Sequence, residues 1–144
     1  MNNLTQNVQG GTSMGTVVNA IGKHLIIEFN GASNLTDHDV AESVFEKAVE
    51  AAGATLLNIN LHSFKTEEMQ EAGFTGVAIL AESHMSIHTW PELGYAALDV
   101  FMCGDADPLL ALPALEEHFK PEKTEVLLLA RSPEGLEIKK TLNH

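Results

Sequence analysis

The chain has 144 residues, of which 44% are hydrophobic, a size and composition that predict one folded domain with its own core. Its formal net charge of −12 argues against nucleic acid as a partner, because phosphate binding needs a surface rich in lysine and arginine. No apolar run approaches the roughly 20 residues that cross a bilayer, and the single cysteine cannot form an internal disulfide, so we expect a reduced, cytoplasmic protein without a membrane segment.

The first 20 residues are rich in Asn, Gln, Gly, Ser and Thr. They have neither a basic start nor a long apolar stretch, so they lack the pattern of a secretory signal. We therefore expect residues 1–20 to form a flexible tail and residues 21–144 to form a single domain.

Apolar spacing and capping residues predict two helices. After a first predicted strand at 23–30 (KHLIIEFN), apolar residues recur at the spacing of one helix face from Thr36 to about Ala52. Threonine is a preferred capping residue, so we expect Thr36 to cap this helix. The pair Asp107-Pro108 predicts the start of a second helix, because proline is favoured at the first helical position.

The remaining apolar segments have the length and residue types of strands. We expect strands at 54–64, 74–81, 95–102, 124–130 and 136–140, with strand-like alternation also around 84–88. Strands interrupted by two helices predict an α+β two-layer sandwich, in which the helices pack on one face of an antiparallel sheet. The other face would then need cover from a second copy or a ligand. The β-α-β-β order is also compatible with a ferredoxin-like arrangement.

The segment 81–92 (AESHMSIHTWPE) places a hydroxyl nucleophile, Ser83, directly after a carboxylate residue, with two histidines and a tryptophan close by. The Ser83 hydroxyl can attack the carbonyl of Glu82 in an N-to-O acyl shift that forms an ester. Removal of the Ser83 α proton eliminates the ester to dehydroalanine, and hydrolysis then releases ammonia and leaves a pyruvoyl group. A histidine suits the proton acceptor, because its pKa lies near neutrality. The pyruvoyl carbonyl can form a Schiff base with a substrate amine and draw electrons from a breaking carboxylate bond.

The same segment resembles the self-cleavage site of the S-adenosylmethionine decarboxylases. Further segments that match in family order are Gly22-Lys23-His24-Leu25, His62-Ser63-Phe64, Thr75-Gly76-Val77 and Cys103-Gly104. The resemblance implies a proenzyme that splits into a β chain, 1–82, and a pyruvoyl-capped α chain, 83–144. It also implies that S-adenosylmethionine is the substrate, that the product is the aminopropyl donor for spermidine, and that processed protomers form a homodimer with sites near the interface.

The resemblance also implies roles for individual residues. Ser83 is the precursor of the pyruvoyl group, and His88 is the proton acceptor in self-processing. Cys103 is the proton donor in decarboxylation, and the Thr75 hydroxyl assists processing. The implied substrate contacts are Phe64 and Trp90 on the adenine, Glu92 on the ribose hydroxyls, Glu82 at the end of the cut chain, and Glu28 in a less defined role.

One segment departs from the family pattern. The stretch between Phe64 and Thr75 (KTEEMQEAGF) is a few residues longer than the compact loop of bacterial members, and it carries three glutamates. These carboxylates leave open a basic amino acid, ornithine or arginine, as the substrate of the same pyruvoyl chemistry. A solvated surface loop is the simpler interpretation, because loops tolerate insertions.

Other interpretations of the motif are weaker on physical grounds. We expect no metal site at His84 and His88, because residues four apart on a strand are about 13 Å apart, too far to share a zinc ion. A serine hydrolase is disfavoured, because the Gly-x-Ser-x-Gly elbow is missing. An unprocessed, non-catalytic homologue that acts as a partner subunit remains open, because a sequence does not reveal whether cleavage occurs. The histidines expected to be ordinary structural or surface residues are His24, His38, His62 and His118.

Overall fold

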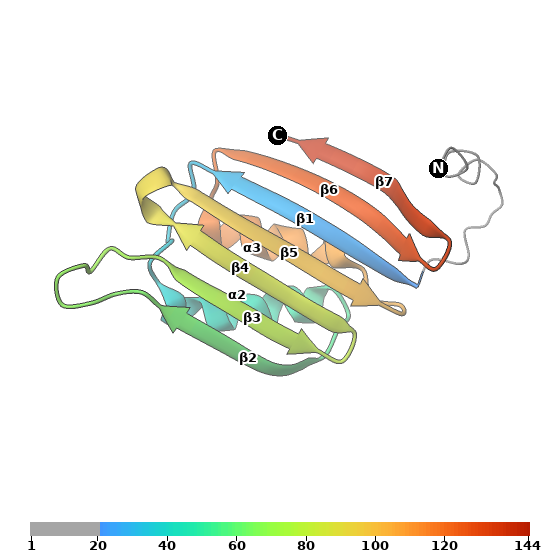
Figure 1. Cartoon of the computed structure of the whole chain (residues 1–144), viewed down its shortest axis with the longest axis horizontal. Coiled ribbons are helices and arrows are strands. Elements are labelled where there is room, and N and C mark those ends of the chain that lie inside the picture. Colours follow the sequence, from blue (N-terminus) through green and yellow to red (C-terminus); the bar gives the residue numbers. More distant parts are fainter. Residues whose placement is uncertain (1–20) are drawn as a thin grey trace.

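The computed structural model describes residues 21–144, and the predicted flexible tail, residues 1–20, lies outside the described residues. The described residues form a seven-stranded sheet in which every neighbouring pair of strands is antiparallel. Within this part of the chain, two α-helices lie on one face of the sheet (Figure 1). The predicted α+β sandwich with helices on one face of an antiparallel sheet is therefore confirmed.

The predicted strands and helices are all present, with small shifts at their ends. The strands are β1 (Gly22–Asn30), β2 (Leu56–Ser63), β3 (Phe74–Leu80), β4 (Ser83–Trp90), β5 (Tyr95–Cys103), β6 (Lys123–Ser132) and β7 (Gly135–Asn143). The helices are α2 (His38–Ala51) and α3 (Leu112–Phe119), with short 3-10 helices η2 (Pro91–Leu93) and η3 (Pro108–Ala111). No helix among residues 21–144 is long and apolar enough to span a membrane.

The strand order is β2-β3-β4-β5-β1-β6-β7. From β1 the chain passes through α2 to the edge strand β2, and β2 to β5 then return as four consecutive antiparallel strands to the side of β1. The second helical segment carries the chain to β6 on the other side of β1. The ferredoxin-like alternative is wrong, because that arrangement joins only two consecutive strands between its helices.

The core lies between the sheet and the two helices. Strand β1 shows the alternation that a one-sided sheet requires, because Leu25, Ile27 and Phe29 are fully buried while Ile26 and Asn30 are exposed. The residues that α2 and α3 bury against these strands are Ala41, Val44, Phe45, Ala48, Val49, Leu112, Leu115 and Phe119. Each large apolar side chain buried in this way contributes about 1.5–3 kcal/mol.

The helix starts differ in detail from the sequence prediction. The N-cap of α2 is Asp37 rather than Thr36, and no side chain caps the helix. The Thr36 prediction is wrong because the chain makes a turn through Thr36 before helical geometry begins. At the second helix the prediction holds, since the Asp107 carboxylate accepts a hydrogen bond from the Leu109 N–H at 3.1 Å. The first turn there is 3-10, and α3 follows it.

The face of the sheet opposite α2 and α3, which we call the open face, is not covered by any helix among the described residues (Figure 1). Several large apolar side chains remain exposed on it, including Val77 and Ile79 of β3 at 42% and 48% exposure. Polar residues alternate with the core residues along the central strands and form a connected network on the same face. The open face is therefore both the largest uncovered surface of the sheet and the side on which the polar chemistry gathers.

Candidate active site

The proposed cleavage point lies in the tight turn between β3 and β4. Leu80 pairs with Ser83 across this hairpin, so Ala81 and Glu82 form a two-residue turn. Ser83 has a φ of +143°, a value that residues other than glycine seldom adopt. Such a conformation costs roughly 1–3 kcal/mol and persists only where the surrounding structure imposes it. The chain is therefore strained at Ser83, the residue that the sequence predicts to be the nucleophile.

Two backbone donors hold Glu82 in this turn. Its carbonyl oxygen accepts a hydrogen bond from the Cys103 N–H at 2.9 Å, and its carboxylate accepts one from the Thr55 N–H at 2.8 Å. Thr55 also accepts a hydrogen bond from the Ala81 N–H at 2.9 Å. An N–H directed at a carbonyl stabilises the negative charge that develops on its oxygen during nucleophilic attack. The Glu82 carbonyl is thus held and polarised for attack.

Cys103 is the last residue of β5, and its backbone contact with Glu82 brings it beside the bond before Ser83. The residue before it, Met102, is the direct cross-strand partner of Ser83. Cys103 is half-buried and forms no disulfide. Three of the predicted site residues, Glu82, Ser83 and Cys103, are therefore neighbours at one end of β4.

Thr75 and His88 form a second group, farther along the hairpin. They are direct cross-strand partners on β3 and β4, and the Thr75 Oγ1 lies 2.6 Å from the His88 Nδ1. His88 is five residues beyond Ser83 on β4, a separation of about 16 Å along an extended strand. His88 of a protomer is therefore too far from Ser83 of the same protomer to exchange a proton with it directly.

Thr75 and His88 line an open groove of about 900 Å³ at that end of the sheet. Phe64, Trp90 and Glu92 of the predicted site also line the groove, and Ser83 and Cys103 do not. The β2–β3 loop, which projects beyond the sheet in Figure 1, supplies further lining residues that the sequence analysis did not assign to the site. These are Met69, Glu71, Ala72 and Gly73.

Glu28 does not line the groove but supports it through two aromatic residues. The Tyr95 hydroxyl donates a hydrogen bond to the Glu28 carboxylate, and the Tyr95 ring stacks on Trp90 with centroids 5.2 Å apart. The hydrogen bond to Glu28, together with burial and the negative charge of Glu28, raises the pKa of Tyr95 to about 12. Tyr95 therefore stays protonated at neutral pH and holds one face of Trp90 while Trp90 lines the groove.

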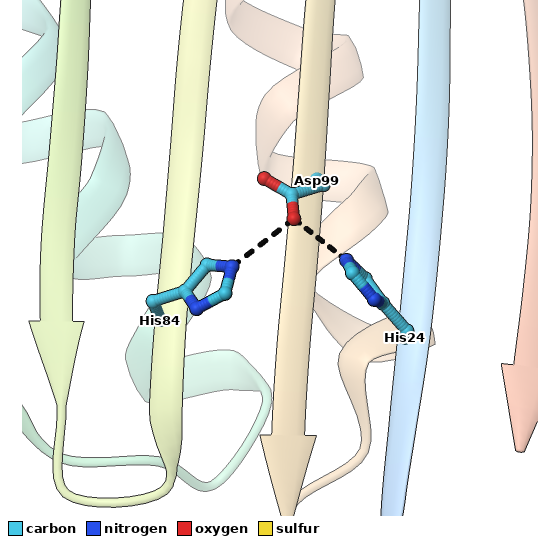
Figure 2. A group of neighbouring side chains, drawn as sticks. All are labelled: His24, His84 and Asp99. Atoms are coloured by element: carbon cyan, nitrogen blue, oxygen red, sulfur yellow. Dashed lines mark hydrogen bonds and ion pairs between the residues drawn. The ribbon is translucent and has the colours of Figure 1, made fainter. Parts of the chain in front are cut away.

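A third polar group lies on the open face near the start of β4 (Figure 2). Asp99 of β5 accepts hydrogen bonds through Oδ2 from the Nε2 atoms of His24 and His84, at 2.6 and 3.1 Å. Its Oδ1 accepts one from the Ser86 hydroxyl. Burial alone would raise the pKa of Asp99, but the hydrogen bonds from Ser86 and the two histidines outweigh it and lower that pKa. His24, expected to be an ordinary histidine, thus belongs to a defined network, and Asp99 was not identified from the sequence.

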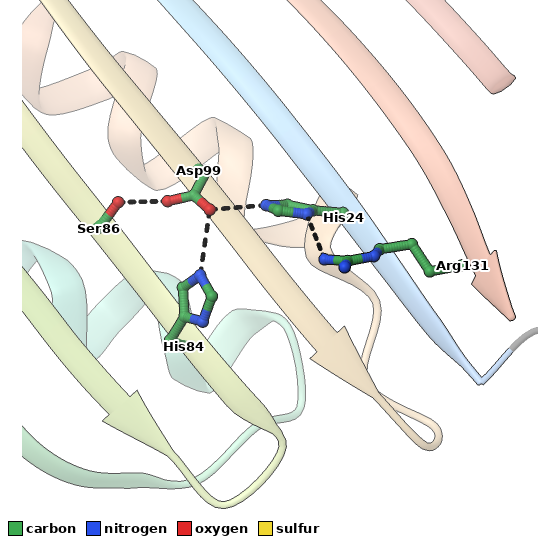
Figure 3. A network of polar contacts seen from close by, with 5 residues as sticks. All are labelled: His24, His84, Ser86, Asp99 and Arg131. Carbon is green, nitrogen blue, oxygen red and sulfur yellow. Dashed lines mark hydrogen bonds and ion pairs between the residues drawn. The ribbon is translucent and has the colours of Figure 1, made fainter. Parts of the chain in front are cut away.

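The ligand atoms of His24, His84 and Asp99 lie within 4.8 Å of one another, close enough to hold a metal ion. Figure 3 shows why hydrogen bonding is the better interpretation, since an Arg131 guanidinium nitrogen lies 3.1 Å from the His24 Nδ1. A guanidinium only donates, so Nδ1 accepts and the neutral ring carries its proton on Nε2, facing Asp99. A metal-bound histidine needs the opposite arrangement, in which Nε2 is unprotonated and Nδ1 donates.

Comparison with known proteins agrees with the motif and the fold. The family described as S-adenosylmethionine decarboxylase matches residues 23–132. A protein named S-adenosylmethionine decarboxylase proenzyme from Methanococcus maripaludis is 48% identical over 114 residues, which cover 77% of this chain and 89% of that protein. A protein of the same name from Thermomicrobium roseum is 42% identical over 113 residues, covering 78% and 94% of the two chains.

A solved structure has the same fold. The crystal structure of the adenosylmethionine decarboxylase from Aquifex aeolicus superposes with a TM-score of 0.69 at 29% identity, and the match covers 80% of this chain and 93% of that chain. The family match spans both groups at the ends of β4, from Thr75 to Cys103. On the sequence match, the fold and the placement of these residues, the chain belongs to the S-adenosylmethionine decarboxylase family.

Proposed function

We propose that the chain is the proenzyme of a pyruvoyl-dependent S-adenosylmethionine decarboxylase, which cuts itself between Glu82 and Ser83 into a β chain, 1–82, and an α chain, 83–144. The observation that carries this proposal is the strained φ of Ser83 beside a Glu82 carbonyl that accepts the Cys103 N–H. Family membership supports the substrate, and the product would be the aminopropyl donor for spermidine.

The geometry of the turn suits an N-to-O acyl shift. The Ser83 oxygen bonds to the Glu82 carbonyl carbon, the peptide C–N bond breaks, and the released nitrogen takes up a proton. Loss of the Ser83 α proton then breaks the bond between Cβ and the ester oxygen, which releases fragment 1–82 with a new main-chain carboxylate on Glu82 and leaves dehydroalanine. Addition of water to the corresponding imine and loss of ammonia give the pyruvoyl group. The strain at Ser83 is relieved when the turn is cut, which favours the forward direction.

The site would be completed by a second copy of the chain. A twofold pairing of open faces, with the β4 strands running in opposite directions, would bring Ser83 and Cys103 of one copy to the groove with Thr75 and His88 of the other. The exposed Val77 and Ile79 on the same face provide apolar surface for that contact. Twofold symmetry then makes two equivalent sites for each dimer.

In this arrangement, different side chains of the protein serve self-cleavage and decarboxylation. His88, held by Thr75 at 2.6 Å, is positioned to accept the Ser83 α proton during self-cleavage. The pyruvoyl group supplies the electron sink for loss of the substrate carboxylate. Cys103 then returns a proton to the carbon that has lost carbon dioxide, a role that requires a free thiol and suits the reducing cytoplasm.

The groove suits an adenosyl group that carries a positive charge. Phe64 and Trp90 offer exposed aromatic surface, at 55% and 38% exposure, on which an adenine ring can stack. The Glu92 carboxylate can accept hydrogen bonds from ribose hydroxyls, and the groove volume of about 900 Å³ is ample for such a ligand. The net charge of −12 further favours a cationic substrate over an anionic one.

Two measurements test the proposal. Denaturing mass spectrometry should give two chains that meet at residue 83, with the second lighter by one ammonia than a chain that starts with serine. Purified protein should then release carbon dioxide from S-adenosylmethionine. A single uncut chain of 15.5 kDa would instead favour a non-catalytic homologue that serves as a partner subunit.

A basic amino acid remains the second candidate substrate, because the loop residue Glu71 lines the groove and could pair with a guanidinium or ammonium group. Ornithine and arginine are therefore assayed beside S-adenosylmethionine. Release of carbon dioxide from either of them alone would replace the substrate while leaving the pyruvoyl chemistry in place.

A further inference from the structure

Self-cleavage at Ser83 creates a free chain end where the cofactor must sit. Before cleavage, the turn through Ala81 and Glu82 ties the start of β4 to β3. After cleavage, residue 83 is the first residue of the α chain, and free ends of strands fray unless other contacts hold them. A reacting group needs placement within about 0.5 Å, so the cut enzyme requires an anchor at the start of β4. This inference rests on the proposed function.

The side chains that follow residue 83 provide such an anchor. His84, the next residue, lies on the Asp99 carboxylate at 3.1 Å, and Ser86 donates to the other oxygen of the same carboxylate. Asp99 lies on β5, which remains within the α chain after cleavage. The Asp99 carboxylate therefore bonds to two residues of β4, His84 and Ser86, both within the first four residues of the α chain.

Asp99 also has a hydrogen-bond partner in the β chain, the fragment 1–82. His24 on β1 reaches Asp99 Oδ2 at 2.6 Å, and the Arg131 guanidinium lies 3.1 Å from the other ring nitrogen of His24 (Figure 3). The Phe101 ring packs beneath this group, 5.0 Å from the His24 ring and 4.5 Å from the Arg131 guanidinium carbon. The network joins β4, β5, β1 and β6, so it holds the α-chain terminus against both fragments.

We propose that Asp99 is a positioning residue for decarboxylation, which acts through His84 to hold the pyruvoyl-bearing start of the α chain in place after self-cleavage. The hydrogen bonds from Ser86 and His24 fix the orientation of the Asp99 carboxylate, and this keeps Oδ2 in place to accept from His84. Asp99 is needed for this positioning only in the cut protein, because in the uncut chain the Ala81-Glu82 turn joins residue 83 covalently to β3.

The test replaces Asp99 with asparagine, which keeps the shape and removes the charge. Asp99→Asn should still cut itself at residue 83, as measured by intact mass. Its kcat should fall by roughly tenfold to a hundredfold, because small displacements of a reacting group have effects of that size, while KM stays within about twofold. Amide hydrogen exchange over residues 84–86 should speed up in cut Asp99→Asn but not when the same substitution is made in the uncut Ser83→Ala background.

A matched control uses another aspartate–histidine contact. Asp39 lies 3.0 Å from the ring of His38 at the start of α2, on the helical side of the molecule. Asp39→Asn should leave cleavage, kcat and the exchange of residues 84–86 unchanged. Light scattering confirms that the variants keep the oligomeric state of the wild type, since Asp99 lies on the open face.

Several outcomes would overturn the assignment. These are an unchanged kcat in Asp99→Asn, a rise in KM that accounts for the whole loss, or equal acceleration of exchange in the cut and uncut backgrounds. If Asp99→Asn fails to fold, Ser86→Ala removes one of the three hydrogen bonds to Asp99, and it should lower kcat in the same direction by a smaller factor. A folded Ser86→Ala with wild-type kcat would then refute the proposal. Failure of the proposed function is recognised separately, because wild-type protein would remain uncut or release no carbon dioxide.

Discussion

The turn at the start of β4 and the groove at its other end differ in how their functional atoms are held. At the turn, backbone N–H groups hold the functional atoms, because the Glu82 carbonyl and carboxylate both accept hydrogen bonds from them. At the groove, side chains provide the chemistry, with His88 and Trp90 exposed to a cavity. The turn holds Ser83 without His88, and the groove holds His88 without Ser83.

Under the proposed function, this separation means that one protomer alone could not complete the site. About 16 Å of extended strand separates Ser83 from His88, and β4 is too rigidly paired on both sides to fold back on itself. In the proposed dimer, each end of β4 would meet the other end of β4 in the second copy. Substitutions at the turn, in the groove and in both can separate the contributions of the two ends of β4.

The largest effect is expected at the turn. Ser83→Ala removes the nucleophile, so self-cleavage should be abolished and the protein should remain one chain. Denaturing mass spectrometry checks this directly, and the folded state of the variant is confirmed by circular dichroism. A Ser83→Ala protein that still yields fragments 1–82 and 83–144 would eliminate the acyl-shift mechanism.

His88→Ala removes the proposed base from the groove and should slow self-cleavage by roughly 10²–10⁴-fold, the usual contribution of a general base. Co-expression with Ser83→Ala should restore cleavage of the His88→Ala chains, because a mixed dimer combines an intact turn from one copy with an intact groove from the other. With random pairing, roughly half of the His88→Ala chains should be cut. No rescue on co-expression would show that the two ends do not meet across a dimer.

Cys103→Ala separates the two roles of this residue. The backbone N–H that contacts the Glu82 carbonyl is retained, so self-cleavage should proceed nearly as in the wild type. Loss of the thiol should lower kcat for carbon dioxide release by roughly a hundredfold or more. The measurement is single-turnover decarboxylation by fully cut protein, and a variant that turns over at the wild-type rate would remove Cys103 from proton transfer.

Met69→Ala tests whether the long β2–β3 loop contacts the substrate in the groove. Met69 lines the groove, and its loss should weaken substrate binding by roughly 1 kcal/mol, which raises KM about fivefold with little change in kcat. Glu68→Gln is the matched control, because Glu68 is exposed in the same loop but is not a lining residue. Equal KM values for wild type and Met69→Ala would indicate that this loop is a solvated surface loop without a part in substrate binding.

Local features of the chain allowed the sequence to predict the cleavage point, because Glu82 and Ser83 are adjacent. The apolar spacing in α2 likewise predicted a helix with one buried face. The Thr75–His88 contact depends on the register between β3 and β4, which a sequence does not specify. Family resemblance implied roles for both residues without predicting that they lie far from Ser83.

The Asp99 network could not be predicted, because its members come from distant parts of the chain. His24 and Asp99 are 75 positions apart, and His24 and Arg131 are 107 apart. Their meeting requires β1 to lie between β5 and β6, an order that follows from the crossover through α2 rather than from any local pattern. Met69 was missed for a different reason, since a methionine among glutamates in a loop has no distinguishing spacing.

The smallest effect concerns the support behind the groove, where Tyr95 joins Glu28 to Trp90. Because the pKa of Tyr95 is raised to about 12 in the folded protein, the folded state holds its phenolic proton more tightly than the unfolded chain does. This contribution to stability is fully present below pH 10, the ordinary tyrosine pKa, and is lost as the pH rises from 10 towards 12. Urea unfolding at pH 9 and pH 11.5 should therefore show a larger loss of unfolding free energy for wild type than for Tyr95→Phe. Equal losses in the two proteins would mean that the Tyr95–Glu28 hydrogen bond does not stabilise the fold, and Trp90 would then depend on stacking alone for its position in the groove.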